Sequence, residues 1–286
     1  GIERGYNGLL HNEMRDMDLR SVSEIIHRGG TVLYTARCLE FLTKEGQEQG
    51  AQCCRDNGID ALVVVGGDGS FKGARALANL GIPCIGIPGT IDNDIACSEY
   101  TIGYDTAMNT AVEMVDKLRD TTQSHDRCSV VEVMGRHAGY IALNVGIATG
   151  AIATLIPERP YDLERDILDR MSFTQKTGKK HFIIVKAEGV PGTAQDLANE
   201  IQAHTGIDSR ATVLGHVQRG GAPTLRDRVT ASQMGYQAVY LLERGIFNRV
   251  VAVSADQIVD YDINVALAMH KTIDTKMIDV ANTISI

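Results

Sequence analysis

The glycine-rich loop Gly66–Ser70, with the sequence GGDGS, is the first segment whose residue types could do chemistry. It follows an apolar run typical of a buried strand and precedes a helical pattern. Its glycines would let backbone N–H groups at a helix start approach phosphate oxygens. Asp68 would repel a polyphosphate unless a cation lay between them, and Mg²⁺ binds through one or two carboxylates plus substrate phosphates. The alternative is an ordinary strand-to-helix turn capped by Asp68.

A second polar segment, Thr90–Asp94, follows the next apolar run, Ile82–Ile87. Its sequence TIDND places two carboxylates two residues apart at the end of a predicted strand, where both can face one pocket. Phosphoryl transfer to an alcohol needs a carboxylate that accepts the hydroxyl proton. Asp92 fits that role, and Thr90 could orient the nucleophile or a phosphate. A turn rich in Asx and Thr residues is the alternative.

Cationic side chains lie near the ends of several predicted strands. Arginine forks suit bidentate phosphate contacts. Each one alone is most often a solvated surface residue, and His216 also fits a structural role. Several at the same edge of one sheet, beside a glycine loop that carries an aspartate, favour a phosphate-binding cleft. They are Arg37, Arg127, Arg136, Arg210, His216 and Arg219.

Short apolar runs alternate with helical patterns along the chain. This alternation predicts an α/β protein with a largely parallel sheet covered by helices on both faces. In such sheets ligands bind beyond the carboxyl ends of the strands, which is where the polar segments above fall. Strands are expected over 61–65, 82–87, 129–133, 152–156, 181–185, 211–214 and 249–253. Helices are expected from Ser70 to about Leu80, over 105–119 and over 226–242.

Composition narrows the class of protein. The 286 residues, 44% of them apolar, are enough for one or two domains. The net charge of −8 disfavours duplex nucleic acid as a partner. The six cysteines lack a CxxC spacing, which indicates reduced thiols in a cytoplasmic protein. We find no signal peptide, and the longest apolar runs are too short to span a membrane.

The chain resembles the phosphofructokinase family over nearly its whole length. Five segments occur in the order of that family: GGDGS at 66–70, PGTIDND at 88–94, MGR at 134–136, AEG at 187–189 and RATVLGHVQRGG at 210–221. The resemblance implies two similar domains in a homotetramer, with 1–103 plus 217–268 binding the nucleotide and 104–216 plus 269–286 binding the sugar phosphate. It implies Mg²⁺-dependent transfer of the ATP γ-phosphoryl group to the 1-hydroxyl of fructose 6-phosphate, a step of glycolysis.

The same resemblance assigns roles position by position. Asp92 matches the catalytic base, Asp68 matches the Mg²⁺ ligand, and Arg136 would offset charge that develops on the transferred group. ATP contacts are implied for Arg37, Cys38, Gly67, Asp68, Gly69 and Ser70. Sugar-phosphate contacts are implied for Thr90, Ile91, Asp92, Met134, Gly135, Arg136, Glu188, His216, Val217, Gln218 and Arg219, and from a neighbouring subunit for Arg127 and Arg210.

Two glycines bear on the phosphoryl donor. Relatives that use pyrophosphate typically carry Asp where this chain has Gly69 and Lys where it has Gly89. Either side chain would fill space that a nucleotide's inner phosphate needs, so the sequence favours ATP.

The resemblance also implies an effector site that departs from the family pattern. It would comprise Arg119, Gly150, Ala151, Ile152, Lys179, Lys180 and His181. Ile152 stands where a carboxylate is expected, Thr177 where a lysine is expected, and Leu19 where an arginine is expected. We therefore expect weak or altered allosteric control by ADP. A solvated lysine pair is the alternative for Lys179 and Lys180.

The family opens with a strand, a Gly-Gly-Asp loop and a helix before the residues that match Gly1. The sequence is then either incomplete or that of a true fragment, for which exposed edge groups, poor stability and weak ATP turnover would be expected. This gap favours one competing function, an inactive or regulatory nucleotide-binding protein. The retained Asp68, Asp92 and Arg136 disfavour it. Other GGDG kinases, such as NAD kinase or diacylglycerol kinase relatives, lack the PGTIDND and LGHVQRGG segments, and a dehydrogenase would need a GxGxxG loop.

Overall fold

The computed structural model describes residues 1–285, which divide into two compact units. Unit 1 comprises Gly1–Thr90, Asp94–Gly103 and Gly221–Lys271. Unit 2 comprises Ile91–Asn93, Tyr104–Gly220 and the residues from Thr272 onward. In this division residues 217–220 belong to unit 2, and residues 269–271 belong to unit 1.

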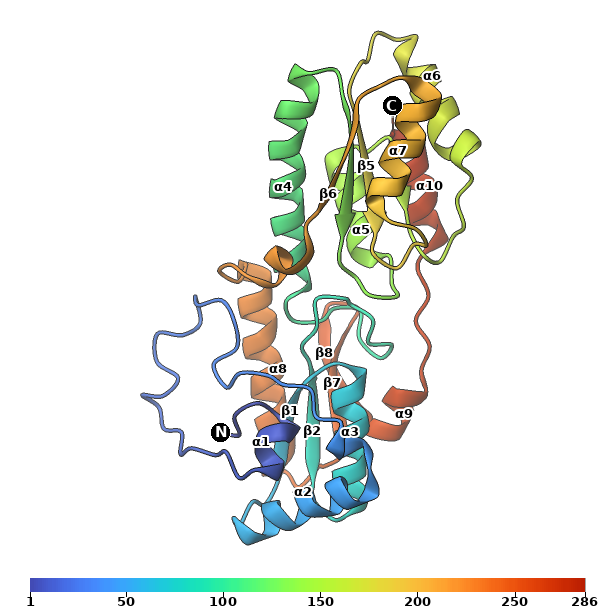
Figure 1. Cartoon of the computed structure of the whole chain (residues 1–286). Coiled ribbons are helices and arrows are strands. Elements are labelled where there is room, and N and C mark those ends of the chain that lie inside the picture. The colour runs from blue at the N-terminus through green and yellow to red at the C-terminus, as the bar shows by residue number, and fades with distance from the viewer. Residues whose placement is uncertain (286) are drawn as a thin grey trace. The chain divides into compact units, whose positions relative to one another are not determined.

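Unit 1 is built on a four-stranded sheet with the strand order β1-β2-β7-β8 (Figure 1). β1, β2 and β7 are parallel, and β8 runs antiparallel to β7 at the edge. The strands are β1 (Leu62–Gly66), β2 (Cys84–Pro88), β7 (Arg249–Ser254) and β8 (Gln257–Asp262). The helices are α1 (Tyr6–Leu10), η1 (Glu40–Leu42), α2 (Lys44–Asp56), α3 (Asp68–Asn79), α8 (Leu225–Glu243) and α9 (Ile263–Ala268).

Both faces of this sheet are covered, because successive side chains of a strand point to opposite faces. Along β2, Cys84 packs into the apolar cluster formed with α2, α3 and α9, whereas Ile85 and Ile87 pack against α8. β7 alternates in the same way, with Val250 on the first side and Val251 on the second. Figure 1 shows α3 and α8 on opposite sides of β1 and β2.

Unit 2 contains a second four-stranded sheet, which is entirely parallel in the order β4-β5-β3-β6. β3 and β5 are nearly continuous buried apolar runs, as expected for strands covered on both faces. The strands are β3 (Cys128–Val133), β4 (Ala153–Leu155), β5 (Phe182–Ala187) and β6 (Ser209–Val213). The helices are α4 (Tyr104–Ser124), α5 (Tyr140–Thr149), η2 (Glu164–Leu168), α6 (Asp169–Gln175), α7 (Ala194–Thr205), η3 (Gly215–Arg219) and α10 (Thr275–Ile284).

The predicted α/β class, with largely parallel sheets covered by helices, is confirmed. All seven predicted strands have a counterpart among the observed ones, and α3, α4 and α8 correspond to the three predicted helices. The antiparallel edge strand β8 and the helices α2 and α7 were not predicted. Among the described residues, no helix is long and apolar enough to cross a membrane.

Candidate active site

The glycine-rich loop in unit 1 joins β1 to α3. Gly67 is the N-cap residue with an extended backbone, and its carbonyl accepts hydrogen bonds from the N–H groups of Ser70 at 2.9 Å and Phe71 at 3.1 Å. Within the described part of the chain, no side chain caps this helix. An uncapped helix N-terminus presents N–H donors and positive potential to an anion. The loop can therefore bind phosphate oxygens through its backbone.

The glycines of this loop differ in the space around them. A Cβ atom on Gly66 would lie 2.3 Å from Ser70 Oγ, so the strand-to-helix turn itself requires glycine there. A Cβ atom on Gly69 would meet no atom within 4 Å. Packing within the chain does not explain Gly69, and the space in front of it is open to a ligand.

The N-terminal segment contacts the first turn of α3 through Tyr6. Tyr6 stacks on Phe41 with ring centroids 4.1 Å apart, and its hydroxyl donates to the carbonyl of Ser70 at 2.5 Å. Arg37 is exposed and Cys38 is half-buried, both in the irregular segment before η1. The hydrogen bonds and ion pairs found among residues 1–285 do not join either of them to the glycine loop.

A cavity of about 210 Å³ in unit 1 lies beside the glycine loop, and Asp68 and Asp94 both line it. Lys271 lines it as well and donates from Nζ to the carbonyl of Ser98 at 2.7 Å. Burial lowers the pKa of Lys271 to about 8, although Asp94 acts in the opposite direction. Asp68 also pairs with Lys72 at 2.6 Å, but both side chains are largely exposed, so this pair is weak.

Two carboxylates in one cavity fit Mg²⁺, which takes one or two carboxylates and completes its octahedron with phosphate oxygens and water. No cluster of three or more His, Cys, Asp and Glu side chains that could hold a metal exists within residues 1–285. A metal here would therefore need oxygens from a ligand. Sequence reasoning assigned the metal to Asp68 alone. It placed Asp94 beside Asp92, whereas the cavity groups Asp94 with Asp68.

The TIDND segment is where the chain passes from unit 1 into unit 2 and back. Thr90 belongs to unit 1, and its carbonyl accepts from the Thr101 hydroxyl at 2.6 Å. Asp92 belongs to unit 2 and is half-buried, next to the buried Asn93, whose φ is +52°. Asparagine adopts this left-handed conformation more readily than most residues. The conformation of Asn93 sets the direction of the chain immediately after Asp92.

Hydrogen bonds to β7 and α8 hold the segment that follows Asp94. The Ser98 hydroxyl accepts from the N–H of Val253 at 2.9 Å and donates to the carbonyl of Tyr100 at 2.6 Å. Asp227 is 2% exposed and accepts from the Tyr100 hydroxyl at 2.5 Å and from the N–H of Gly103 at 2.8 Å. These bonds fix the backbone that carries Asp94.

In unit 2, the MGR segment is clamped by two side chains from other elements. Glu188 Oε1 accepts from the N–H groups of Gly135 at 3.1 Å and Arg136 at 2.6 Å, and Gln218 Oε1 accepts from the N–H of Met134 at 2.8 Å. Arg136 has a φ of +57°, a left-handed conformation that is uncommon outside glycine. The clamp holds this strained turn and leaves the Arg136 side chain exposed.

The HVQR segment forms η3 directly after β6. His216, Val217 and Arg219 are exposed, whereas Gln218 is 1% exposed. The Nε2 group of Gln218 is buried without a hydrogen-bond partner among the described residues. A buried unpaired donor is uncommon, so this amide nitrogen can donate a hydrogen bond to a ligand or water.

Arg127 and Arg210 do not lie with the other cations of unit 2. Arg127 precedes β3, and the register Cys128↔Ser209 and Ser129↔Arg210 puts both arginines at the amino ends of their strands. Asp208 binds Arg127 at 2.6 Å and Arg210 at 3.0 Å, and these arginines hold the pKa of Asp208 below its usual value. The prediction that several of these cations share one sheet edge is wrong for these two. β3 has six residues, so roughly 20 Å separates them from the MGR segment.

The predicted effector residues gather in unit 2 around the end of α4. Arg119 donates to the carbonyl of Thr149, next to Gly150, whose φ is +58°. Burial and then Arg119 lower the pKa of Lys179, and burial, Lys179 and Arg119 lower the pKa of His181. These like charges therefore lie close together. Ala151 and Ile152 are buried, and Lys180 reaches only Asp126, at 4.0 Å.

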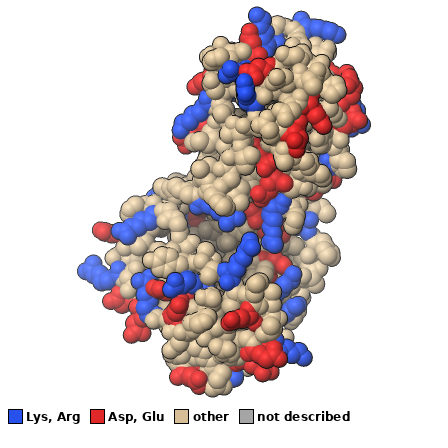
Figure 2. All heavy atoms as spheres, in the orientation of Figure 1, with Lys and Arg blue, Asp and Glu red and all other residues tan. Residues whose placement is uncertain are grey.

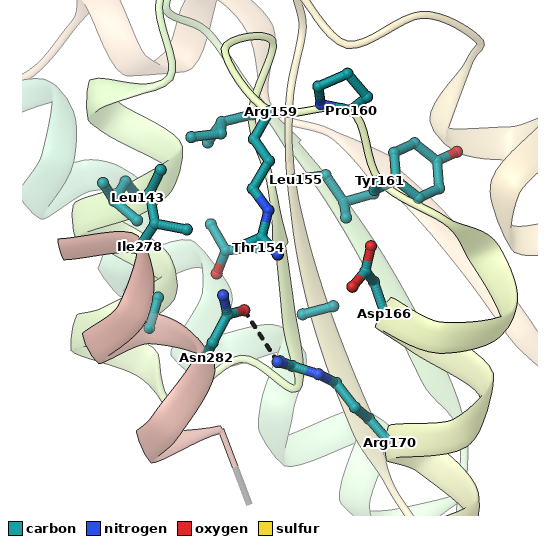
Figure 3. A pocket seen from close by; sticks show the side chains of 13 residues that line it. Leu143, Thr154, Leu155, Arg159, Pro160, Tyr161, Asp166, Arg170, Ile278 and Asn282 are labelled. Carbon is teal, nitrogen blue, oxygen red and sulfur yellow. Dashed lines mark hydrogen bonds between the residues drawn. The ribbon is translucent and has the colours of Figure 1, made fainter. Parts of the chain in front are cut away.

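A second hollow, in unit 2, lies among β4, α6 and α10 (Figure 3). Its volume of about 20 Å³ leaves room for roughly one water molecule. Arg170 donates to Asn282 Oδ1 at 3.0 Å and so ties α6 to α10. The residues predicted from the sequence to bind ATP, sugar phosphate or effector do not line this hollow.

Positive and negative side chains are interspersed on the face that Figure 2 shows, over both units. On this face, phosphate binding would have to come from local groups, because no broad basic surface covers it. The chemistry of unit 1 suits a metal–polyphosphate, and that of unit 2 suits a second anionic ligand.

Comparison with known proteins agrees with this geometry. The phosphofructokinase family model matches residues 1–242. An ATP-dependent 6-phosphofructokinase of Clostridium botulinum is 51% identical over 285 residues, which cover 100% of this chain and 89% of the relative. The structure of phosphofructokinase from Saccharomyces cerevisiae is 33% identical with a TM-score of 0.86, over 99% of this chain but only 41% of the yeast chain.

A more distant structure has the same fold. The pyrophosphate-dependent phosphofructokinase from Marinobacter aquaeolei is 24% identical with a TM-score of 0.85, over 96% of this chain and 76% of that chain. At this identity the likeness concerns the fold alone. The family model and the full-length clostridial match together establish that this chain belongs to the phosphofructokinase family.

Proposed function

We propose that the protein transfers the γ-phosphoryl group of ATP to the 1-hydroxyl of fructose 6-phosphate, giving fructose 1,6-bisphosphate and ADP. One observation carries this proposal: the 51% identity to an ATP-dependent 6-phosphofructokinase extends over all of this chain. The chain keeps Asp68, Asp92 and Arg136, so the alternative of an inactive or regulatory nucleotide-binding protein is not favoured. The reaction belongs to glycolysis. The six free cysteines support a cytoplasmic location.

The ATP side of the reaction is assigned to unit 1. The N–H groups at the start of α3 would bind phosphate oxygens, and Arg37 and Cys38 would contact the nucleotide. Asp68, with Asp94 beside it, would hold the divalent cation, which we propose to be Mg²⁺. When bound, this cation would neutralise charge on the phosphates of ATP.

The sugar-phosphate side is assigned mainly to unit 2. Asp92 would accept the proton of the 1-hydroxyl as that oxygen attacks the γ-phosphorus. Arg136 would stabilise the charge on the transferred group. The contacts from Thr90, Ile91, Met134, Gly135, Glu188, His216, Val217, Gln218 and Arg219 stay predictions, as does the role of Asp92 itself.

The proposed phosphoryl donor is ATP rather than pyrophosphate. The open space at Gly69 supports this choice, because an Asp side chain would project into the region in front of the helix N-terminus. At Gly89 a Cβ atom would lie 2.8 Å from Val65 Cγ1, so any side chain there must displace Val65. Packing against Val65 therefore also explains Gly89, so the support for ATP comes from the open space at Gly69.

The proposed assembly is a homotetramer in which a neighbouring subunit supplies Arg127 and Arg210. The distance argument supports this, since within one unit these arginines lie at the opposite end of β3 from the MGR segment. A phosphate beside His216 and Arg219 is then reached by Arg127 and Arg210 only from another copy of the chain.

Regulation by ADP is proposed to be weak. Arg119 and Lys179 supply positive charge for an anion. Ile152, at 0% exposure, offers no carboxylate for the metal of a nucleotide effector. We expect ADP to change the activity less than about twofold. A strong, saturable activation that disappears in Arg119→Ala would contradict this.

The proposed function is tested by measuring ADP release with fructose 6-phosphate, with ATP and pyrophosphate supplied in parallel. We expect turnover with ATP well above that with pyrophosphate. Asp92→Ser should lower kcat roughly 10²–10⁴-fold with a smaller change in the KM for the sugar phosphate, because a general base acts in the transition state. Faster turnover with pyrophosphate would overturn the donor. An unchanged kcat in Asp92→Ser would overturn the base.

A further inference from the structure

The cavity beside the glycine loop is lined by a half-buried lysine, Lys271, to which the proposed reaction gives no role. Asp68 and Asp94 bring two negative charges to its lining, and Lys271 brings one positive charge. Even partial burial of a lysine is costly, because its ion loses contacts with water. Lys271 is the last residue of unit 1 before the chain returns to unit 2.

The ammonium group is held in place by backbone that is itself fixed. Lys271 Nζ donates at 2.7 Å to the carbonyl of Ser98, a residue that is 2% exposed. The Ser98 hydroxyl bonds to the N–H of Val253 and to the carbonyl of Tyr100. The charge of Lys271 is therefore positioned against Asp94, with which it interacts electrostatically.

We propose that Lys271 is a positioning residue that makes this cavity prefer a metal–nucleotide complex over a free divalent cation. The inference rests on the proposed use of ATP at the same site. A fixed ammonium competes with a free cation for Asp68 and Asp94, which weakens binding of the metal alone. The same ammonium attracts the phosphates that arrive with the metal, which strengthens binding of the complex.

This role predicts effects of opposite sign when the charge is removed. Lys271→Met should bind free Mn²⁺, a spectroscopic substitute for Mg²⁺, about five- to tenfold more tightly, a size expected for one partly buried charge. It should bind the complex of Mg²⁺ with a non-hydrolysable ATP analogue more weakly by a similar factor. Lys271→Arg, which keeps the charge, should restore both affinities to within about threefold.

The measurements are electron paramagnetic resonance of free Mn²⁺ without nucleotide and titration calorimetry with the metal–nucleotide complex, both on the full chain. Lys72→Met is the matched control. Lys72 also pairs with Asp68, but its side chain is 61% exposed, so its removal should change either affinity less than about twofold. Equal effects in Lys72→Met and Lys271→Met would overturn the special position of Lys271.

The other outcomes are equally decisive. If Lys271→Met weakens both affinities, the residue has only a structural role and the inference fails. If it changes neither, the charge does not act on the cavity and the inference also fails. Failure of the proposed function is seen separately, as a wild-type protein that neither binds the metal–nucleotide complex nor phosphorylates fructose 6-phosphate.

Discussion

The loop Gly66–Ser70 in unit 1 and the loop Met134–Arg136 in unit 2 differ in whether side chains bind their backbone N–H groups. The first opens α3 without a side-chain cap and has free space in front of Gly69. In the second, Glu188 and Gln218 already accept the hydrogen bonds of three successive N–H groups. The first loop has no side-chain acceptor at its helix start, whereas the second binds three N–H groups through side chains.

This difference indicates how each unit recognises an anion. A backbone cradle at a helix start suits a polyphosphate, since it follows the shape of the phosphate chain and needs no particular side chain. A clamped turn must instead bind through the side chains that it presents, here Arg136 and the exposed residues of η3. Anion binding in unit 2 would therefore be more sensitive to which side chains are present. Anion binding in unit 1 would be more sensitive to any side chain added to the glycine loop.

The largest expected effect tests the backbone cradle. Gly69→Asp should raise the KM for ATP roughly 100-fold or more, because a carboxylate would occupy the phosphate position and repel it. Gly69→Ala is the control. Its Cβ atom meets nothing within 4 Å, so the variant should fold and keep most of its ATP binding. Initial rates over a range of ATP concentrations measure both. Equal losses in the two variants would show that the loop is only a turn.

The next effect tests the clamp. Glu188→Ala should raise the KM for fructose 6-phosphate about 10- to 30-fold, because it leaves the N–H groups of Gly135 and Arg136 without their charged acceptor. The KM for ATP should change less than about twofold. Glu188→Gln keeps an acceptor oxygen and should lie between the wild type and Glu188→Ala. A matching rise in the KM for ATP would break the contrast between the two loops.

Apolar runs predicted the strands, and apolar periodicity predicted the two long helices α4 and α8, because apolar residues recur there at helical spacing, as Ala107, Ala111 and Val115 do in α4. It did not predict α2, whose buried positions are the small residues Gly46, Gly50, Ala51 and Cys54. A Cβ atom on Gly50 would lie 2.7 Å from the Phe41 ring, so close packing selects glycine where propensity disfavours it. Tertiary contact overrides the local signal there.

The site was predictable where a motif follows a strand, as for Gly66–Ser70 and Met134–Arg136. Partners that come from distant elements were not. Glu188 and Gln218 reach the same turn because β5 and β6 flank β3 in the order β4-β5-β3-β6. The sequence does not reveal this order. The ion pairs of Asp208 with Arg127 and Arg210 depend on the register of β3 and β6, so the prediction that placed these arginines with the other cations was wrong.

The smallest effect compares the cores of the two units. Burial raises the pKa of Cys84 in unit 1 and of Cys128 in unit 2 to about 12, from a value of 9.0 that applies in the unfolded chain. Above pH 9 the unfolded chain loses these protons first, so the stability that each thiol contributes falls as the pH rises toward 12. At pH 10 each thiol should lower the free energy of unfolding by about 1.4 kcal/mol relative to its value at neutral pH.

Urea unfolding of the wild type, Cys84→Ala and Cys128→Ala at pH 8 and pH 10 checks this. The stability difference between wild type and each variant should shrink by the same amount in both cases. A smaller change for Cys84→Ala would mean that the core of unit 1 admits water more readily than the core of unit 2.

The ion pairs of Asp208 have a consequence for how activity depends on protein concentration. In a single chain, Asp208 occupies the two arginines that we assign to a neighbour's phosphate. When the protein is diluted below the dissociation constant of the assembly, Asp208 of each chain would still neutralise these arginines, and the site of that chain would lack the neighbour's pair. Specific activity should then fall on dilution by mass action, and it should recover when the chain is concentrated again.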